Sequence, residues 1–234
     1  MQPMEIIKGK SISTLTPEEL LGPLNDVEAR YAPPRLYVAG VVQTPLPRPR
    51  VAVVGSRKAS GAGLEAATQI ARILARNQVV VVSGLAEGID TAAHRATIEE
   101  NGYTVAVLGT PLNRVYPAKN FELQDKIMRE YCAVSQFLNG HPTQPRDFVI
   151  RDRTMALVCN ASIIVEAGET SGSLAQGWEA LRLGRPLYIW KLVLEKRSLS
   201  WPKKMMEYGA VALEDPKDIL GFLPPRERIV SVAQ

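Results

Sequence analysis

The sequence predicts an α/β protein with a doubly wound, mostly parallel sheet that carries helices on both faces. Two valine-rich runs support this prediction, residues 50–55, ending in Gly55, and residues 79–83, ending in Ser83. Uninterrupted β-branched runs are typical of strands buried on both faces, as in a parallel sheet covered by helices. Strand and helix patterns alternate regularly from Arg50 onward, which predicts βαβ units with right-handed crossovers.

The composition of the 234 residues is that of a globular protein, with 46% hydrophobic and 22% charged residues. A net charge of +4 leans mildly towards anionic partners without establishing nucleic-acid binding. Cys132 and Cys159 are the only cysteines, and His94 and His141 are the only histidines. This inventory argues against a disulfide framework and a zinc site, so we expect no metal and no cofactor.

The first residues contain no apolar segment of the kind found in signal peptides. No apolar run approaches the roughly 18 residues that a membrane-spanning helix needs. We therefore expect a protein of the cytoplasm that has no membrane partner.

Three parts are expected along the chain. Residues 1–47 form an N-terminal arm packed on the core, residues 48–220 form the core domain, and residues 221–234 form a C-terminal tail. Within the arm, Thr16 followed by Pro17 indicates a capped helix start. Prolines then punctuate an extended stretch, in which residues 36–42 are expected to form a short edge strand.

The core elements follow from the same pattern. Besides the two valine-rich strands, we expect strands at 104–108, 131–135, 162–166, 186–190 and 211–212. Helices are expected near 61–76, 89–101, 120–131, 148–159, 173–183 and 201–208, with a helical turn after Asp215.

The turn after the first valine-rich strand has the residues of a phosphate-binding loop. Gly55 allows close backbone approach, Ser56 supplies a hydroxyl, Arg57 and Lys58 bring positive charge, and the next helix adds its positive end. The turn matches neither the dinucleotide fingerprint nor the P-loop. A tight turn with solvated basic side chains therefore remains the alternative.

Two further turns are expected at the same edge of the sheet. One contains Ser83 and Gly84, and the other contains Ser171 and Gly172 just before a predicted helix. Ligands of doubly wound sheets bind at the carboxyl ends of the strands, so three such turns favour a polyanionic ligand.

Two polar residues after the second turn are interpreted as structural. Asp90 is expected to cap the helix that follows. His94 lies four residues later on the same helix face, where it can pair with Asp90.

Residues 146–153 combine arginines with an aromatic ring. Guanidinium groups bind phosphates, and a ring such as that of Phe148 can stack on an unpaired base. On a helix, Arg151 and Arg153 point about 200° apart, so only one of them can face a cleft squarely. Read on their own, these residues favour the structural interpretation, with Phe148 in the core and the arginines forming surface ion pairs with Asp147 and Asp152.

The order of these motifs resembles the DprA/Smf family of DNA-processing proteins from about Tyr31 to Trp190. The matching stretches are 31–40, 51–57, 83–90 with His94, 108–110, 116–120, Phe148 with 151–153, 165–167 with 171–174, and 184–186.

This resemblance implies an extended Rossmann-like fold and a homodimer that binds single-stranded DNA without catalysis. It also implies protection of incoming DNA and loading of a RecA-type recombinase during natural transformation. The DNA-binding residues that it implies are Gly55, Ser56, Arg57, Lys58, Ser83, Gly84, Phe148, Arg151, Arg153, Ser171 and Gly172.

One residue departs from the family pattern. Asp152 stands where the family usually has asparagine, between Arg151 and Arg153. A carboxylate there opposes phosphate binding unless it neutralises a neighbouring arginine.

A second function remains open, namely a nucleotide sensor or a nucleoside-monophosphate-processing enzyme of the lysine-decarboxylase-like group. Those enzymes place glutamates where this chain has Ala175 and Gln176. Glu166 and Glu179 are present nearby but at other positions, which weakens the case for acid–base chemistry.

Overall fold

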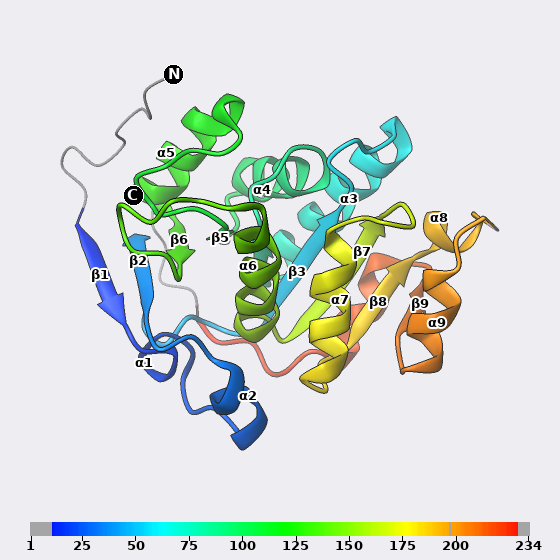
Figure 1. Ribbon diagram of the computed structural model, residues 1–234. Coiled ribbons are helices and arrows are strands. Elements are labelled where there is room, and N and C mark those ends of the chain that lie inside the picture. The colour runs from blue at the N-terminus through cyan, green and yellow to red at the C-terminus, as the bar shows by residue number, and fades with distance from the viewer. Residues whose placement is uncertain (1–10, 197, 229–234) are drawn as a thin grey trace.

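The computed structural model describes residues 11–196 and 198–228, and its centre is a twisted sheet (Figure 1). Within these residues the strands follow the order β1-β2-β6-β5-β4-β3-β7-β8-β9 across the sheet. Their bounds are β1 Ile12–Leu15, β2 Leu36–Gly40, β3 Arg50–Gly55, β4 Val80–Ser83, β5 Thr104–Leu108, β6 Cys132–Ser135, β7 Ala161–Glu166, β8 Leu187–Trp190 and β9 Val211–Leu213. The run from β6 to β9 is parallel throughout, which confirms the predicted fold class.

Helices cover both faces of this sheet (Figure 1). They are α1 Pro17–Leu21, α2 Asp26–Tyr31, α3 Gly61–Arg76, α4 Ile89–Glu99, α5 Phe121–Glu130, α6 Pro145–Val158, α7 Ser173–Arg182, α8 Lys191–Leu194 and α9 Trp201–Glu207. Two 3₁₀ helices, η1 Ala118–Asn120 and η2 Pro216–Phe222, complete the described elements.

Alternate residues of each central strand enter the two hydrophobic layers. In β3, Ala52 and Val54 pack on the side of α6 and α9, whereas Val51 and Val53 pack on the side of α3 and α4. All four side chains are at most 2% exposed. Because both faces of β3 are buried, apolar and polar residues do not alternate in the valine-rich run.

The chain reverses its direction of travel across the sheet at β3. From β3 it builds β4, β5 and β6 on one side, and it then returns to build β7, β8 and β9 on the other. β3 and β7 are neighbours in the sheet although the chain does not connect them directly, so their carboxyl ends lie side by side. In doubly wound sheets such a switch point is where ligands bind.

The N-terminal residues contribute strands to this sheet, and one prediction about them is wrong. β2 is not an edge strand, because β1 pairs with it on one side and β6 on the other, both antiparallel. The predicted helix start is confirmed, with Thr16 accepting a hydrogen bond from the Glu19 N–H in a capping box. The predicted boundaries at residues 47 and 220 stay predictions.

Residues 223–228 run along the amino ends of the strands. The Glu227 N–H donates to the Arg48 carbonyl at 2.7 Å, and the Arg48 N–H donates back to the Glu227 carboxylate at 3.0 Å. Arg226 reaches Asn77 at 3.5 Å, just before β4. The described part of the tail thus lies at the sheet edge opposite the switch point. None of the described helices is long and apolar enough to cross a membrane.

Gly40 marks a close approach between β2 and the end of α5, and its substitution tests the register of this side of the sheet. Its φ of 114° suits glycine, and an added Cβ would overlap the Tyr131 carbonyl. We expect Gly40→Ala to lower the free energy of unfolding by about 2–4 kcal/mol, because strain and overlap combine. Urea denaturation measures the change.

Gly61→Ala is the matched control for this experiment. Gly61 opens α3, and nothing lies within 4 Å of the position that a Cβ would take there. Alanine at this position should leave stability unchanged or raise it by up to about 1 kcal/mol. Equal effects of the two substitutions would contradict the packing described for Gly40.

Candidate functional site

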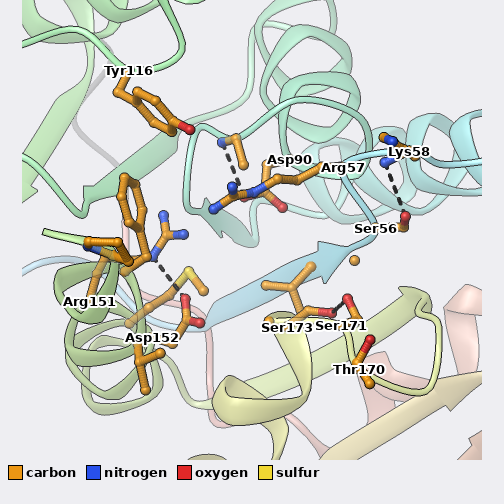
Figure 2. A pocket seen from close by; sticks show the side chains of 18 of the residues that line it. Ser56, Arg57, Lys58, Asp90, Tyr116, Arg151, Asp152, Thr170, Ser171 and Ser173 are labelled. Carbon is orange, nitrogen blue, oxygen red and sulfur yellow. Dashed lines mark hydrogen bonds and ion pairs between the residues drawn. The ribbon is translucent and has the colours of Figure 1, made fainter.

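A cleft of about 730 Å³ lies at the switch point, between the first turns of α6 and the start of α7 (Figure 2). Three turns contribute to its walls, the turns after β3, β4 and β7. Its lining comprises residues 54–58, Ala86, Asp90, Arg114, Tyr116, 143–145, Phe148, Val149, Arg151, Asp152, Met155, Gly168 and 170–173. The predicted convergence of the three turns is therefore present in the structure.

The turn after β3 depends on glycine where three segments meet. A Cβ on Gly55 would lie 2.6 Å from the Glu166 carbonyl oxygen and 2.7 Å from a side-chain carbon of Ile89. The Ser56 N–H donates to the same Glu166 carbonyl at 2.6 Å, which joins the turn to the end of β7. The Ser56 hydroxyl accepts the Lys58 N–H at 3.1 Å, so the loop is closed by its own side chain.

The positive end of α3 is less available than the sequence predicts. The Ser60 hydroxyl accepts the Gly63 N–H at 3.0 Å and caps the helix. The Glu166 carboxylate in turn accepts from the Ser60 N–H at 2.9 Å and from the Ser60 hydroxyl at 3.0 Å. The Glu166 carboxylate thus occupies the position where a ligand anion was expected. The Lys196 ammonium pairs with this carboxylate at an N–O distance of 2.8 Å.

The start of α7 is open by comparison. Gly172 occupies the N-cap position without a side-chain hydrogen bond to the helix. The hydroxyls of Ser171 and Ser173 lie 2.9 Å apart at this helix end and face the cleft in Figure 2. The Leu174 and Ala175 N–H groups donate to the Ser171 and Gly172 carbonyls, so the anion-binding character of this helix start rests on its uncapped positive end and on the two hydroxyls.

An aromatic and cationic group forms the opposite wall. The Phe148 ring lies 5.1 Å from the Tyr116 ring, centroid to centroid, at an interplanar angle of 50°. The Arg57 guanidinium carbon lies 5.3 Å from the Phe148 centroid. Phe148 also packs against Gly109, where a Cβ would come within 2.6 Å of the ring. Tyr116 remains 48% exposed, which leaves an aromatic surface for a planar group.

Arg151 and Asp152 lie between these two walls and are each only 5% exposed. The Arg151 guanidinium donates to the Asp152 carboxylate at 2.8 Å and to the Val107 carbonyl at 3.0 Å. It also donates to the Gly84 carbonyl. The carboxylate at the position where the family has asparagine therefore neutralises its neighbouring arginine.

Asp90, also 5% exposed, is a second carboxylate beside this arginine. It accepts the N–H groups of Gly84 and Ala86 at 3.2 and 3.3 Å. Because it serves the loop before α4 and gives that helix no side-chain cap, the predicted capping role is wrong. His94 bonds to Thr104 at 2.7 Å instead of to Asp90, so its role is structural as expected.

Burial sets the protonation of these acids. Desolvation raises the pKa of Asp152 to about 6, although the Arg151 charge opposes the shift. Desolvation also raises the pKa of Asp90, again against the opposing charge of Arg151. Burial lowers the pKa of His94 to about 3, so this imidazole is neutral at physiological pH.

The structure brings most of the predicted site residues together. Gly55, Ser56, Arg57, Lys58, Phe148, Arg151, Ser171 and Gly172 all line the cleft. Gly84 lies beneath Arg151 and lines a small adjoining cavity. Ser83 is fully buried, with its hydroxyl donated to the Val53 carbonyl at 2.7 Å, and Arg153 is exposed outside the lining residues.

Sequence reasoning did not select Arg114, Tyr116 or Thr170, although all three line the cleft. Arg114 and Tyr116 lie in the long loop after β5. The hydrophobic periodicity of the sequence does not predict the path of this loop. Two sequence signals point to Tyr116, namely its place in the family-matching stretch 116–120 and its position directly before Pro117, which constrains the loop.

Fold and cleft define a class, the doubly wound α/β proteins with a polar cleft at the switch point of the sheet. The chain belongs to the family of DNA recombination-mediator protein A, whose model matches residues 15–224. This match confirms the resemblance found in the motifs.

Known relatives agree with this assignment. DNA processing protein DprA of Streptococcus pneumoniae is 40% identical over 157 residues, covering 67% of this chain and 55% of the relative. An X-ray structure of the protein of that name and organism gives a TM-score of 0.76 at 30% identity, covering 92% of this chain and 76% of that chain. DNA processing protein A of Helicobacter pylori, described as having a unique single-stranded DNA binding mode, shares the fold with a TM-score of 0.77 at 22% identity, covering 94% and 97% of the two chains. The chain spans 46–66% of the length of the curated relatives it matches.

Glu166→Gln tests the carboxylate that joins β7 to the start of α3. Burial alone would raise the pKa of Glu166, but hydrogen bonds from Lys196 and Ser60 outweigh it and lower the pKa. The ionised form therefore stabilises the fold above the pKa of the unfolded state, and this contribution disappears as the pH falls through the folded pKa. We expect the variant to lose about 1–3 kcal/mol at neutral pH.

The difference between wild type and Glu166→Gln should shrink below about pH 4. Chemical denaturation at several pH values measures this. Glu122→Gln, at an exposed position of α5, is the matched control and should change stability by less than about 0.5 kcal/mol. A difference that grows towards acid pH would refute the role assigned to Glu166.

Proposed function

We propose that the protein binds single-stranded DNA in the cleft at the switch point, without catalysing a reaction on it. The observation that supports this most directly is the pairing of two unlike walls across one cleft. Hydroxyls and an open helix end lie on the α7 side, and rings with cations lie on the α6 side. A nucleotide unit presents the same two chemistries, a phosphate and a planar base.

The proposed division of roles follows from these walls. Ser56, Ser171 and Gly172 would receive backbone phosphates, with Lys58 and Arg57 supplying charge. Phe148, together with Tyr116, would stack on a base. Because stacking and phosphate contacts do not depend on base identity, we expect weak sequence preference.

The wider biological role is part of this proposal. We infer that the protein acts in the cytoplasm, protects incoming single strands, and delivers them to a RecA-type recombinase during natural transformation. The family to which the chain belongs, described as recombination mediators, supports this role.

We further propose a homodimer. Support comes from exposed apolar side chains near the β9 end of the sheet, where Met206 is 42%, Tyr208 67% and Val211 53% exposed. Clustered apolar exposure of this kind favours a protein contact. Light scattering coupled to gel filtration distinguishes a dimer from a monomer.

One observation keeps a nucleotide-processing role as the second candidate. The cleft has a volume suited to a small molecule, and it contains the Asp152 carboxyl, whose pKa is raised to about 6 by desolvation. Neither Glu166 nor Glu179 is free, since Lys196 and Arg182 pair with them. Release of free base from nucleoside monophosphates would favour this candidate over simple binding.

Single substitutions in the aromatic and cationic wall test the proposed DNA site. We expect Phe148→Ala and Arg57→Ala each to weaken binding of an oligothymidylate by about 1–3 kcal/mol, the scale of one stacked base or one charged contact. Fluorescence anisotropy at low salt measures the affinity. Wild-type affinity should fall steeply with salt and be far weaker for duplex DNA.

Two arginine variants serve as comparisons. Arg76→Ala removes a cation from the last turn of α3, roughly 24 Å along the helix from its cleft-side end, and should leave affinity nearly unchanged. Arg153→Ala tests the second arginine implied by the family resemblance, and its position outside the cleft predicts a smaller loss than Arg57→Ala. No binding by the wild type at low salt would rule the proposal out.

A further inference from the structure

The acidic part of the cleft is unusual for a surface that receives an anion. Asp90 and Asp152 both line the cleft, each 5% exposed, and the buried guanidinium of Arg151 lies beside them. Two buried carboxylates thus share one buried cation, which leaves an excess negative charge within the wall when both are ionised. Placing a phosphate nearby would add a further like charge at short range.

The position of Arg151 does not depend on the charge of Asp152. Two neutral carbonyl groups, those of Gly84 and Val107, also accept hydrogen bonds from its guanidinium. Protonation of Asp152 therefore removes the compensating charge while the arginine stays in place. Its positive charge then becomes available to an anion in the cleft.

Other charged and titratable groups surround the cluster. Arg57 acts on Asp152 from the turn after β3, and Lys58 and Arg114 are further basic side chains of the cleft wall. On α4, His94 is neutral because burial lowers its pKa to about 3. Glu166, whose pKa is lowered overall by Lys196 and Ser60 against the effect of burial, remains ionised.

Two further contacts of titratable side chains lie close to this region. Glu87, which lines the adjoining small cavity, pairs with Lys119 at 2.6 Å. His141 bonds to the Asp147 carboxylate at 2.8 Å near the start of α6. This imidazole is the titratable group that a test of proton coupling has to control for.

We propose that the cleft takes up a proton when it binds an anionic strand, and that the Asp152 carboxylate, which lies beside Arg151 and Asp90, holds this proton. The inference rests on the proposed binding of single-stranded DNA and adds a pH dependence to the same site. Desolvation raises the pKa of Asp152 to about 6, which brings this carboxyl into the pH range just below neutral. Binding of a phosphate beside it raises that pKa further, so proton and strand bind cooperatively.

The test uses an oligothymidylate of about 15 nucleotides that has no terminal phosphate and carries a rhodamine-type label. Neither thymine, the phosphodiester nor this label titrates between about pH 5.5 and pH 7.5, so the probe keeps a constant charge. At fixed ionic strength, we expect wild-type affinity to rise by about tenfold from pH 7.5 to pH 5.5. One linked proton allows at most a tenfold change per pH unit.

Asp152→Asn replaces the carboxyl with a neutral group of the same shape. The variant should bind at pH 7.5 about as tightly as the wild type does at pH 5.5, and its affinity should change by less than about twofold over the range. His141→Asn should retain the wild-type pH dependence. Circular dichroism confirms that each variant is folded.

A second measurement on the wild type alone covers the case in which Asp152→Asn does not fold. Titration calorimetry near pH 7 in two buffers of different ionisation enthalpy should report net proton uptake on binding. Zero uptake or proton release would overturn the inference.

The two proposals fail in different ways. Binding that is independent of pH, or a full pH dependence retained by Asp152→Asn, overturns proton coupling while DNA binding stands. Loss of the pH dependence in His141→Asn also overturns it, by moving the proton to the imidazole. Absence of binding at every pH overturns the proposed function itself.

Discussion

The arrangement of the cleft depends on the hydrogen bonds that the buried Arg151 guanidinium donates. From α6 it reaches the Gly84 carbonyl after β4, the Val107 carbonyl in β5 and the Asp152 carboxylate of its own helix. A buried charge is tolerated only when its donors are satisfied in this way. The contact therefore holds α6 against the carboxyl ends of two strands, and with it the Phe148 ring that α6 carries into the cleft.

The two helix starts at the cleft differ in whether side chains of the protein itself occupy them. The start of α3, which the sequence marked as a phosphate site, is capped by Ser60, and Glu166 accepts hydrogen bonds from Ser60. No side chain caps the start of α7. The difference moves the expected anion position from the β3 side towards the β7 side, and it was hidden from the sequence because Glu166 lies about a hundred residues after the helix that it serves.

The strand and helix pattern of the core was predictable because both faces of the central strands are buried. Such strands appear in the sequence as uninterrupted apolar runs, for example residues 51–54, which are readily assigned as strands. β1 and α2 were not predicted, since Ile12–Leu15 is only four residues long with two exposed polar residues at its centre, and Asp26–Tyr31 has no buried residue to give it a hydrophobic period. Because β1 was not predicted, β2 was predicted to be an edge strand. In the site, the turn residues were found from local sequence, whereas the burial of Arg151 and the approach of Asp90 are long-range contacts that no local pattern encodes.

The ladder between β3 and β7 sets how much the two sides of the cleft can separate. Four consecutive pairs, from Val51 with Ala161 to Val54 with Ile164, join the strands before the register shifts at Gly55, next to the cleft. Opening the walls would mean breaking backbone hydrogen bonds in the middle of the sheet, not swinging a loop. The cleft is thus preorganised, so the entropic cost of the proposed binding would fall mainly on the flexible DNA strand.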